Sequence, residues 1–367
     1  MVIIGCDFHP GVQQLAVLDQ ETGEVIEKRL TPAETREYLL SLRGRQVLIG
    51  AETSGNMVWF ERLVGECGHE LQIGDAAKIR ASNPGRQKHD RGDASHLLRL
   101  LMEDRFPQLW VPSLAERDLR QLLVHRSKLV AMRRQVKNQL QHIAMNQGVQ
   151  RQRKLWSRAG RELLASLELD RWTKLRRDSL LKRLESFDEE VRTLDEFVSA
   201  EAQQSEKARL LMTHPGVGPV ISLAMVLTLG DVSRFANGSK VASYLGLVPE
   251  EKSSGRRRRI GSITKQGSTF MRQLLVEGGQ HAIRDPKWAE SYGRLARKKH
   301  RTGEAKVMVA RKLAVRLYWM LRLHKPYPEV VGHAGQLESS CGRKSQAVRL
   351  NEHPASWSRR SRIGRGA

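Results

Sequence analysis

The chain has 367 residues, 40% of them hydrophobic, which is enough for two or three domains with apolar cores. Its 63 Lys and Arg against 40 Asp and Glu give a formal net charge of +23, so we expect a polyanionic partner, most simply nucleic acid. The scattered Cys6, Cys67 and Cys341 exclude a disulfide scaffold or a zinc ribbon, and the absence of a secretory signal or long apolar run favours a reducing cytoplasm without membrane contact.

Strands and helices alternate in the first part of the chain. Thr31 and Glu34 form a capping-box pattern that predicts the start of a helix. Gly68 is a plausible stop for a second helix, and a third is expected from Asp90 to Met102. Five short apolar runs are predicted strands: residues 2–8, 14–19, 25–30, 46–51 and 70–73. This pattern predicts an α/β domain over residues 1–108.

Heptad spacing dominates residues 109–209. Apolar residues recur every seven positions from Leu122 to Ile143, and at spacings of four and three from Leu180 to Val198. Such spacing is typical of a coiled coil. We therefore expect two long helices that form either an antiparallel hairpin within one chain or a seam between two chains.

A mostly helical domain is predicted over residues 210–325. It opens with a Pro-Gly-Val-Gly-Pro turn followed by an apolar helix, a pattern similar to a helix-hairpin-helix. Gly216 and Gly218 would let backbone N–H groups approach a phosphate, although a plain interhelical turn explains the motif equally well. Residues 326–367 have the composition of a disordered basic tail.

Four acids of the first domain occupy positions suited to metal binding. Asp7 and Glu52 close apolar strands, whereas Asp90 and Asp93 lie three residues apart at a helix start. Carboxylates at strand ends are costly unless a cation compensates them, and two hard cations can clamp a phosphodiester. Individually each acid is also explained as a cap or strand end. Asp19 and Asp75 better fit turn and cap roles. His9 is expected to point to the other face or into the loop, as a bystander or a DNA contact rather than a metal ligand.

Basic residues surround a pair of serines in the second half. The Lys252–Arg259 run carries five positive charges around Ser253 and Ser254, and such a run is suited to gripping phosphates. An alkoxide would be stabilised among these arginines. The candidate nucleic-acid contacts are Arg256, Arg257, Arg258, Arg259, Lys265 and Arg272.

Several motifs together resemble one family. GCDFH, AETSG and KHDRGDA resemble the Asp-Glu-Asp-Asp (DEDD) transposases of bacterial insertion sequences, the group related to the Piv and MooV invertases. HPGVGP, LGDVSRF, ASYLGLVPEEKSSG and GSITKQGSTFMRQLLVEGG follow in the order of that family's C-terminal domain, so the resemblance covers about residues 2–323. It implies a RuvC-like RNase H fold for the first domain. It also implies four catalytic, metal-binding acids, which are Asp7, Glu52, Asp90 and Asp93, and a nucleophile at Ser254.

The resemblance further implies a recombinase that cuts and rejoins donor and target DNA with Mg²⁺ or Mn²⁺. A structured non-coding RNA would guide it, and the protein would act as a homo-oligomer (dimer or tetramer), with a site composed from both domains, at the bacterial nucleoid. Two alternatives stay open. A junction-resolving nuclease would use the acids and water alone, and a non-catalytic nucleic-acid-binding protein would not need magnesium.

Overall fold

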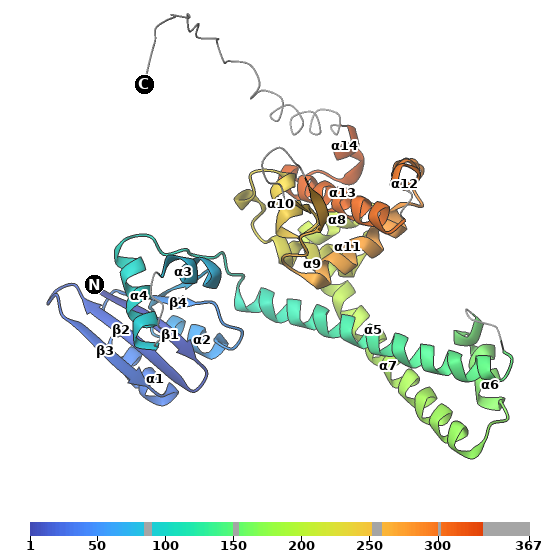
Figure 1. Ribbon diagram of the computed structural model, residues 1–367, viewed down its shortest axis with the longest axis horizontal. Helices are drawn as coiled ribbons and strands as arrows, with labels where there is room; N and C mark the ends of the chain where they lie inside the picture. Colours follow the sequence, from blue (N-terminus) through green and yellow to red (C-terminus); the bar gives the residue numbers. More distant parts are fainter. Residues whose placement is uncertain (84–89, 150–153, 252–258, 300–301, 333–367) are drawn as a thin grey trace, which may run out of the picture. The chain divides into compact units, whose positions relative to one another are not determined.

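The computed structural model describes residues 1–83, 90–149, 154–251, 259–299 and 302–332 (Figure 1). The chain divides into two compact units, Met1–Arg117 and Asp118–Ala367. The finer boundaries expected inside the second unit remain predictions. No helix in these described ranges is both long and apolar enough to cross a membrane.

The first unit is built on a five-stranded mixed sheet in the order β3-β2-β1-β4-β5. The strands β1, β2 and β3 pair antiparallel, whereas β1, β4 and β5 pair in parallel. This arrangement is consistent with the RNase H-like fold expected for the domain. The strand bounds are β1 Val2–His9, β2 Val12–Asp19, β3 Val25–Leu30, β4 Val47–Glu52 and β5 Glu70–Gly74.

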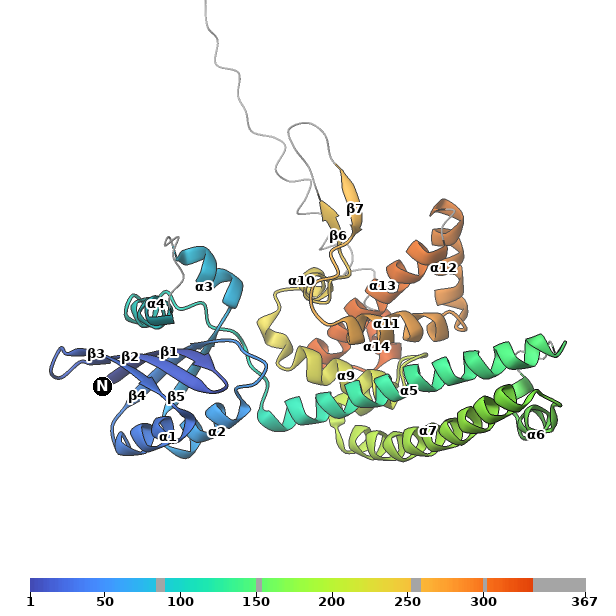
Figure 2. The same cartoon turned by 60° about the horizontal axis from the view of Figure 1, so that its bottom comes forward.

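Helices cover both faces of this sheet (Figure 2). The helices α1 (Pro32–Ser41) and α2 (Val58–Glu66) pack their apolar sides on one face, where they share a core with the even-numbered residues of β1. The helix α4 (Asp90–Met102) packs on the other face, and α3 (Ala76–Ser82) precedes it. The capping box predicted at the start of α1 is present, with Thr31 as its N-cap.

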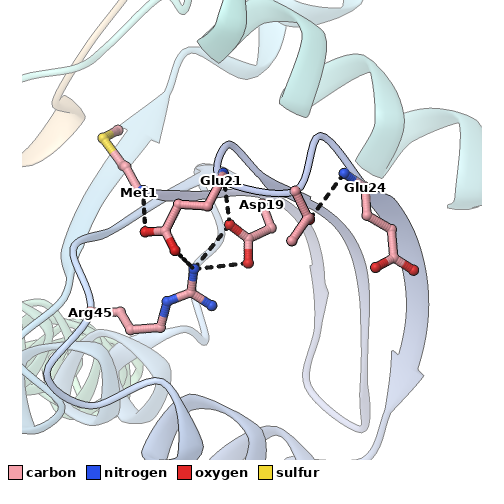
Figure 3. Close-up of polar contacts among 6 residues, drawn as sticks. Met1, Asp19, Glu21, Glu24 and Arg45 are labelled. Carbon is pink, nitrogen blue, oxygen red and sulfur yellow. Dashed lines mark hydrogen bonds and ion pairs between the residues drawn. The ribbon is translucent and has the colours of Figure 1, made fainter.

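An ion-pair network closes the turn between β2 and β3 (Figure 3). Arg45 donates to both carboxylate oxygens of Asp19 at 2.8 and 2.9 Å, and Glu21 joins the network through Arg45 and the amino group of Met1. The hydrogen bonds from Arg45 lower the pKa of Asp19. Asp75 accepts hydrogen bonds from the first turn of α3. The turn and cap roles predicted for these two acids are therefore confirmed.

The second unit begins with a long helical hairpin. The helix α5 (Leu114–Asn146) and the helix α7 (Arg171–Gln204) are joined through a 3₁₀ turn (Lys154–Trp156) and α6 (Arg158–Ser166). Ion pairs join Arg126 to Asp195 at 2.8 Å and Arg133 to Asp188 at 3.2 Å. Because the partner number falls as the α5 number rises, the two helices run antiparallel.

The apolar heptad positions of the two helices meet inside this hairpin. Leu180 and Leu184 of α7 pack with Val136, Leu140 and Ile143 of α5. Of the two arrangements left open by the heptads, the intrachain hairpin is therefore the one that these residues form.

The remainder of the second unit is a helical bundle around an apolar core. The helix α9 packs against α11 and α8, and α11 packs against α13. The elements are α8 Glu206–Met212, α9 Pro219–Leu229, a 3₁₀ turn Val232–Arg234, α10 Gly238–Tyr244, β6 Pro249–Glu251, β7 Ile260–Ile263, α11 Thr269–Ala282, α12 Pro286–Lys299, α13 Thr302–Leu323 and α14 Tyr327–Gly332.

The region is mostly helical, as predicted, and it also contains an antiparallel ribbon of β6 and β7 (Figure 2), whose strands are too short and too exposed to carry an apolar alternation. One expectation for this region was wrong. The segment predicted as a disordered tail from residue 326 begins with α14, where Val330 is buried in the core. Residues 333–367 lie outside the described part of the chain.

The contact between α4 and β1 generates a stability prediction. A Cβ atom on Gly5 would lie 2.2 Å from the carbonyl oxygen of Ala94 and 2.4 Å from the backbone nitrogen of Leu98. Since backbone atoms cannot move aside cheaply, Gly5→Ala should lower the free energy of unfolding by about 2–3 kcal/mol. Gly11→Ala, where no atom lies within 4 Å of the added Cβ, is the matched control and should change it by less than about 0.5 kcal/mol. Urea unfolding of both variants checks this, and equal stabilities would contradict the close packing.

Candidate active site and nucleic-acid surface

Glycines on three neighbouring strands create the surface on which α4 lies. Gly5 of β1 faces the α4 backbone. An added Cβ atom on Gly50 of β4 would collide with Leu101 of α4 and with Phe106, and one on Gly74 of β5 would collide with Ile79 of α3 and with Phe106. Side chains alternate between the two faces of a strand. Residues two positions from these glycines therefore share the α4 face of the sheet.

Asp7 and Glu52 are such residues. Gly5 pairs with Gly50 across the parallel strands β1 and β4, and Cys6 pairs with Ala51. Asp7 and Glu52 each follow by one residue, so their carboxylates emerge from adjacent strand ends on the same face. The Asp7 side chain is 18% exposed and Glu52 is half-buried. The structure thus brings together two of the four acids predicted as a metal site.

The other two acids belong to the start of α4. Asp93 is half-buried and immediately precedes Ala94, the residue whose carbonyl lies over Gly5. Asp90 is the first residue of α4, and its side chain lies outside the described residues. Among the described side chains, no three His, Cys, Asp or Glu groups converge closely enough to hold a metal ion. The four-acid cluster therefore remains a prediction.

Two neighbours of Asp7 were not identified as site residues from the sequence. His9 lies two residues beyond Asp7, hence on the same face, and its Nε2 is 3.3 Å from Oδ2 of Asp7. The expectation that His9 points to the other face or into the loop was wrong, because β1 continues through His9. Gln14 of β2 is the cross-strand partner of Asp7 and is buried. The alternation of side chains along β1 could have placed His9 on the same face as Asp7 from the sequence alone. Placing Gln14 beside Asp7 requires the register of β1 against β2, which the sequence does not show.

A buried histidine fixes α4 to α3. Nδ1 of His96 accepts from Arg99 at 2.7 Å, so the ring proton lies on Nε2, which donates to Oγ of Ser82 at 3.0 Å. Burial lowers the pKa of His96, which keeps the ring neutral in this role. This contact joins the end of α3 to α4, which begins within the KHDRGDA segment, and it positions the helix that carries Asp93.

The donor atoms on this face suit a hard cation. Carboxylate oxygens are the preferred ligands of Mg²⁺ and Mn²⁺. The soft thiol of Cys6 lies on the opposite face in the apolar core, where burial raises its pKa and keeps it protonated. The residues present therefore fit a magnesium or manganese site.

In the second unit, the glycines of the Pro-Gly-Val-Gly-Pro turn have different environments. Gly216 has φ +85°, and a Cβ there would lie 2.5 Å from the backbone nitrogen of Ala282 in α11, so its packing alone requires glycine. Gly218 is the N-cap of α9, makes no side-chain cap, and has no atom within 4 Å of an added Cβ. An open groove of about 570 Å³ adjoins the turn, with Arg126 and Arg284 among its lining residues.

The structure describes three of the six predicted basic contacts. Arg259 and Lys265 are exposed beside β7. Arg272 instead donates to the carbonyl of Gln266 at 2.6 Å and to Oγ1 of Thr269 at 2.9 Å, so its guanidinium holds the turn before α11. Four predicted residues lie outside the described part of the chain: Ser254, Arg256, Arg257 and Arg258.

Comparison with protein families identifies both halves of the chain. Residues 4–146 match a model described as "Transposase", that of the DEDD transposases of the IS110 group. Residues 208–294 match a model described as "Transposase IS116/IS110/IS902 family". The first match contains the sheet, α4 and the acids, and the second contains the turn, the ribbon and α11.

Similar proteins extend over most of the chain. A probable family 20 transposase from Pseudomonas aeruginosa is 25% identical over 77% of this chain and 84% of its own length. The transposase of insertion sequence element IS1111A from Coxiella burnetii is 24% identical over 78% of this chain and 79% of its own. A putative transposase of Sinorhizobium fredii is 24% identical over 88% and 84%. The chain is therefore a DNA transposase that belongs to the DEDD transposases of the IS110/IS116/IS902 family.

Proposed function

We propose that this transposase cuts and rejoins DNA with Asp7, Glu52, Asp90 and Asp93 as a magnesium-binding cluster and Ser254 as the nucleophile. The observation that supports the magnesium-binding cluster is the register of β1 against β4. It places Asp7 and Glu52 side by side on the face that α4 covers, and α4 contributes Asp93.

Each acid has a defined part in the proposed site. A bound Mg²⁺ or Mn²⁺ would supply Lewis-acid stabilisation of charge on a scissile phosphate. Asp7 and Glu52 would provide carboxylate oxygens from a rigid sheet, and Asp90 and Asp93 would provide them from the helix. His9, at 3.3 Å from Asp7, would orient that carboxylate by hydrogen bonding.

The serine distinguishes this proposal from a nuclease. The oxygen of Ser254 would attack the scissile phosphorus, form a phosphoserine bond, and release the other strand end as a hydroxyl. The arginines of the 252–259 run would stabilise the charge that develops on the phosphate. Because the sequence has no Walker A motif, the covalent link would conserve the bond energy for rejoining.

The proposed partners are donor DNA, target DNA and a structured guide RNA, bound by a homo-oligomer. The net charge of +23 supports polyanionic partners, and the family resemblance supports the RNA. The uncapped N-terminus of α9 behind Gly218 is a further candidate phosphate contact.

Removing one ligand charge tests the acid cluster. Asp7→Asn and Asp93→Asn should each lower recombination by about a hundredfold or more, because the proposed metal site loses a carboxylate while the side-chain volume is kept. The matched control is Asp104→Asn on the surface of the same unit, at φ 52°, which asparagine adopts readily. A recombination assay with thermal melting decides the matter, and near-normal activity in either site variant would refute the assignment.

Nucleic-acid affinity should fall steeply with salt. Lys and Arg contacts to phosphates release counterions, so the logarithm of the binding constant should fall linearly with the logarithm of salt concentration, with a slope of about −5 or steeper. Titrating labelled DNA and RNA over a salt series measures this slope. A nearly flat response would show that the basic excess is not the binding surface.

Two adjacent serines provide an internal control for the nucleophile. Ser254→Ala should still bind DNA but form no covalent adduct and no recombinant, whereas Ser253→Ala should retain both activities. Denaturing electrophoresis of labelled DNA detects the adduct. An adduct that persists in Ser254→Ala would move the nucleophile, and full recombination by Ser254→Ala would favour the junction-resolving nuclease chemistry.

A further inference from the structure

The strand registers extend the pair of Asp7 and Glu52 into a longer row across the sheet. Asp7 pairs with Gln14 of β2, and Gln14 pairs with Arg29 of β3. Cross-strand partners project from the same face of a sheet, and neighbouring strands lie about 4.8 Å apart. The α4 side of the sheet therefore carries one cross-strand row: Arg29, Gln14, Asp7 and Glu52.

Contacts of neighbouring residues support this assignment of faces. Oγ of Ser95 in α4 donates to Oε1 of Glu27 at 3.3 Å, and Arg29 follows Glu27 by two residues in β3. Ala16 belongs to the apolar cluster beneath α4, and Gln14 precedes it by two residues in β2. Because side chains alternate between the two faces of a strand, Arg29 and Gln14 both lie on the α4 side.

Gln14 differs from Gln13, the buried glutamine beside it on the opposite face. The carboxamide of Gln13 donates to the carbonyl of His9 at 2.7 Å and accepts from Oγ1 of Thr35 at 2.8 Å. Gln14 is only 5% exposed, yet its carboxamide has no hydrogen-bond partner among the described residues. Its amide atoms are not sealed from solvent, so a ligand can reach them. Hydrogen-bonding groups that a fold encloses but leaves unused are typical of a ligand contact.

The groups of the cross-strand row suit a phosphodiester strand. The carboxylates would hold the cation that binds the scissile phosphate. Gln14, one strand away from Asp7, offers two N–H donors to a phosphate oxygen. Arg29, a further strand away, is exposed and has no carboxylate partner in the described part of the chain. A guanidinium at that position can bind the next phosphate of the same strand.

We propose that Gln14 donates a side-chain N–H to a non-bridging oxygen of the scissile phosphate and that Arg29 binds the neighbouring phosphate. The DNA strand to be cut would then cross the sheet from β1 towards β3. This inference rests on the proposed acid site, but it gives Gln14 a role of its own. Its amide would stabilise the charge that develops on the phosphate without ligating the metal.

Replacing Gln14 with methionine separates this role from a structural one. Gln14→Met keeps the size of the side chain but removes the donor, so recombination by the full-length protein should fall about a hundredfold. Its melting temperature should stay the same or rise, because no hydrogen bond of the fold is lost. Gln13→Met is the matched control and should melt at a lower temperature. Unchanged recombination by Gln14→Met, or a loss of stability like that of Gln13→Met, would overturn the assignment.

A phosphorothioate at the exchanged phosphate identifies the contacted atom. Sulfur accepts hydrogen bonds more weakly than oxygen, so one of the two diastereomers should slow the wild type about tenfold by weakening the contact with Gln14. The same diastereomer should not slow Gln14→Met any further, because that contact is already absent. Equal thio effects in the two proteins for both diastereomers would show that Gln14 does not contact the phosphate.

Mn²⁺ titration followed by electron paramagnetic resonance distinguishes this inference from the acid site on which it rests. Gln14→Met should bind Mn²⁺ like the wild type, whereas Asp7→Asn should bind it at least about tenfold more weakly. Normal recombination by Gln14→Met together with an inactive Asp7→Asn would overturn this inference alone. Full activity of Asp7→Asn would refute the acid site and this inference together.

The contribution of Arg29 is measured by the salt dependence of DNA binding. Arg29→Gln should reduce the slope of the logarithm of the binding constant against the logarithm of salt concentration by about one, because one phosphate contact is lost. Lys28→Gln is the matched control, since it removes a charge from the opposite face of the same strand and should leave the slope unchanged. A slope for Arg29→Gln equal to that of the wild type would contradict the proposed direction of the strand.

Discussion

The backbone contact between α4 and the sheet is the constraint on which the first unit depends. Gly5 lets the carbonyl of Ala94 come so close that any side chain at position 5 would displace the helix. The same face carries Asp7 and Glu52 two residues beyond their glycines, and α4 brings Asp93 to it. The proposed catalytic acids can share one site only if the helix lies directly on the strands. The packing of α4 on the sheet therefore also determines whether the proposed metal site can form.

The second unit depends on the packing of one long helix, α7, against α5. The apolar side of α7 packs against α5, with Leu184 fully buried, and the Arg126–Asp195 and Arg133–Asp188 ion pairs border that contact. Counted over the whole helix, α7 is basic in residues 171–183 and acidic in residues 184–204. Asp188 and Asp195 of the acidic part supply the carboxylates of those two ion pairs. The heptads therefore describe the folding of the hairpin within one chain.

Local signals made much of the fold predictable. The capping box at Thr31 and the helix from Asp90 to Met102 both formed as expected, because caps and periodicity act within a few residues. The heptads at Leu184 could not distinguish a hairpin from a dimer, since an apolar seam does not identify its partner. Likewise, the sequence could not show that Gly216 is required by its contact with Ala282, because that contact joins distant segments. The proximity of Asp7 and Glu52 also depends on the register of β1 against β4, which the sequence does not specify.

Metal-directed cleavage of the polypeptide tests the central claim most directly, independently of recombination. Fe²⁺ with ascorbate and peroxide generates hydroxyl radicals at a bound metal and cuts the nearby backbone, and Mg²⁺ should compete for the same oxygen ligands. The proposed site predicts Mg²⁺-suppressible cuts around residues 7, 52 and 90–93, which are absent in Asp7→Asn. Cuts confined to other segments, or an unchanged pattern in Asp7→Asn, would contradict a metal site built from these four acids.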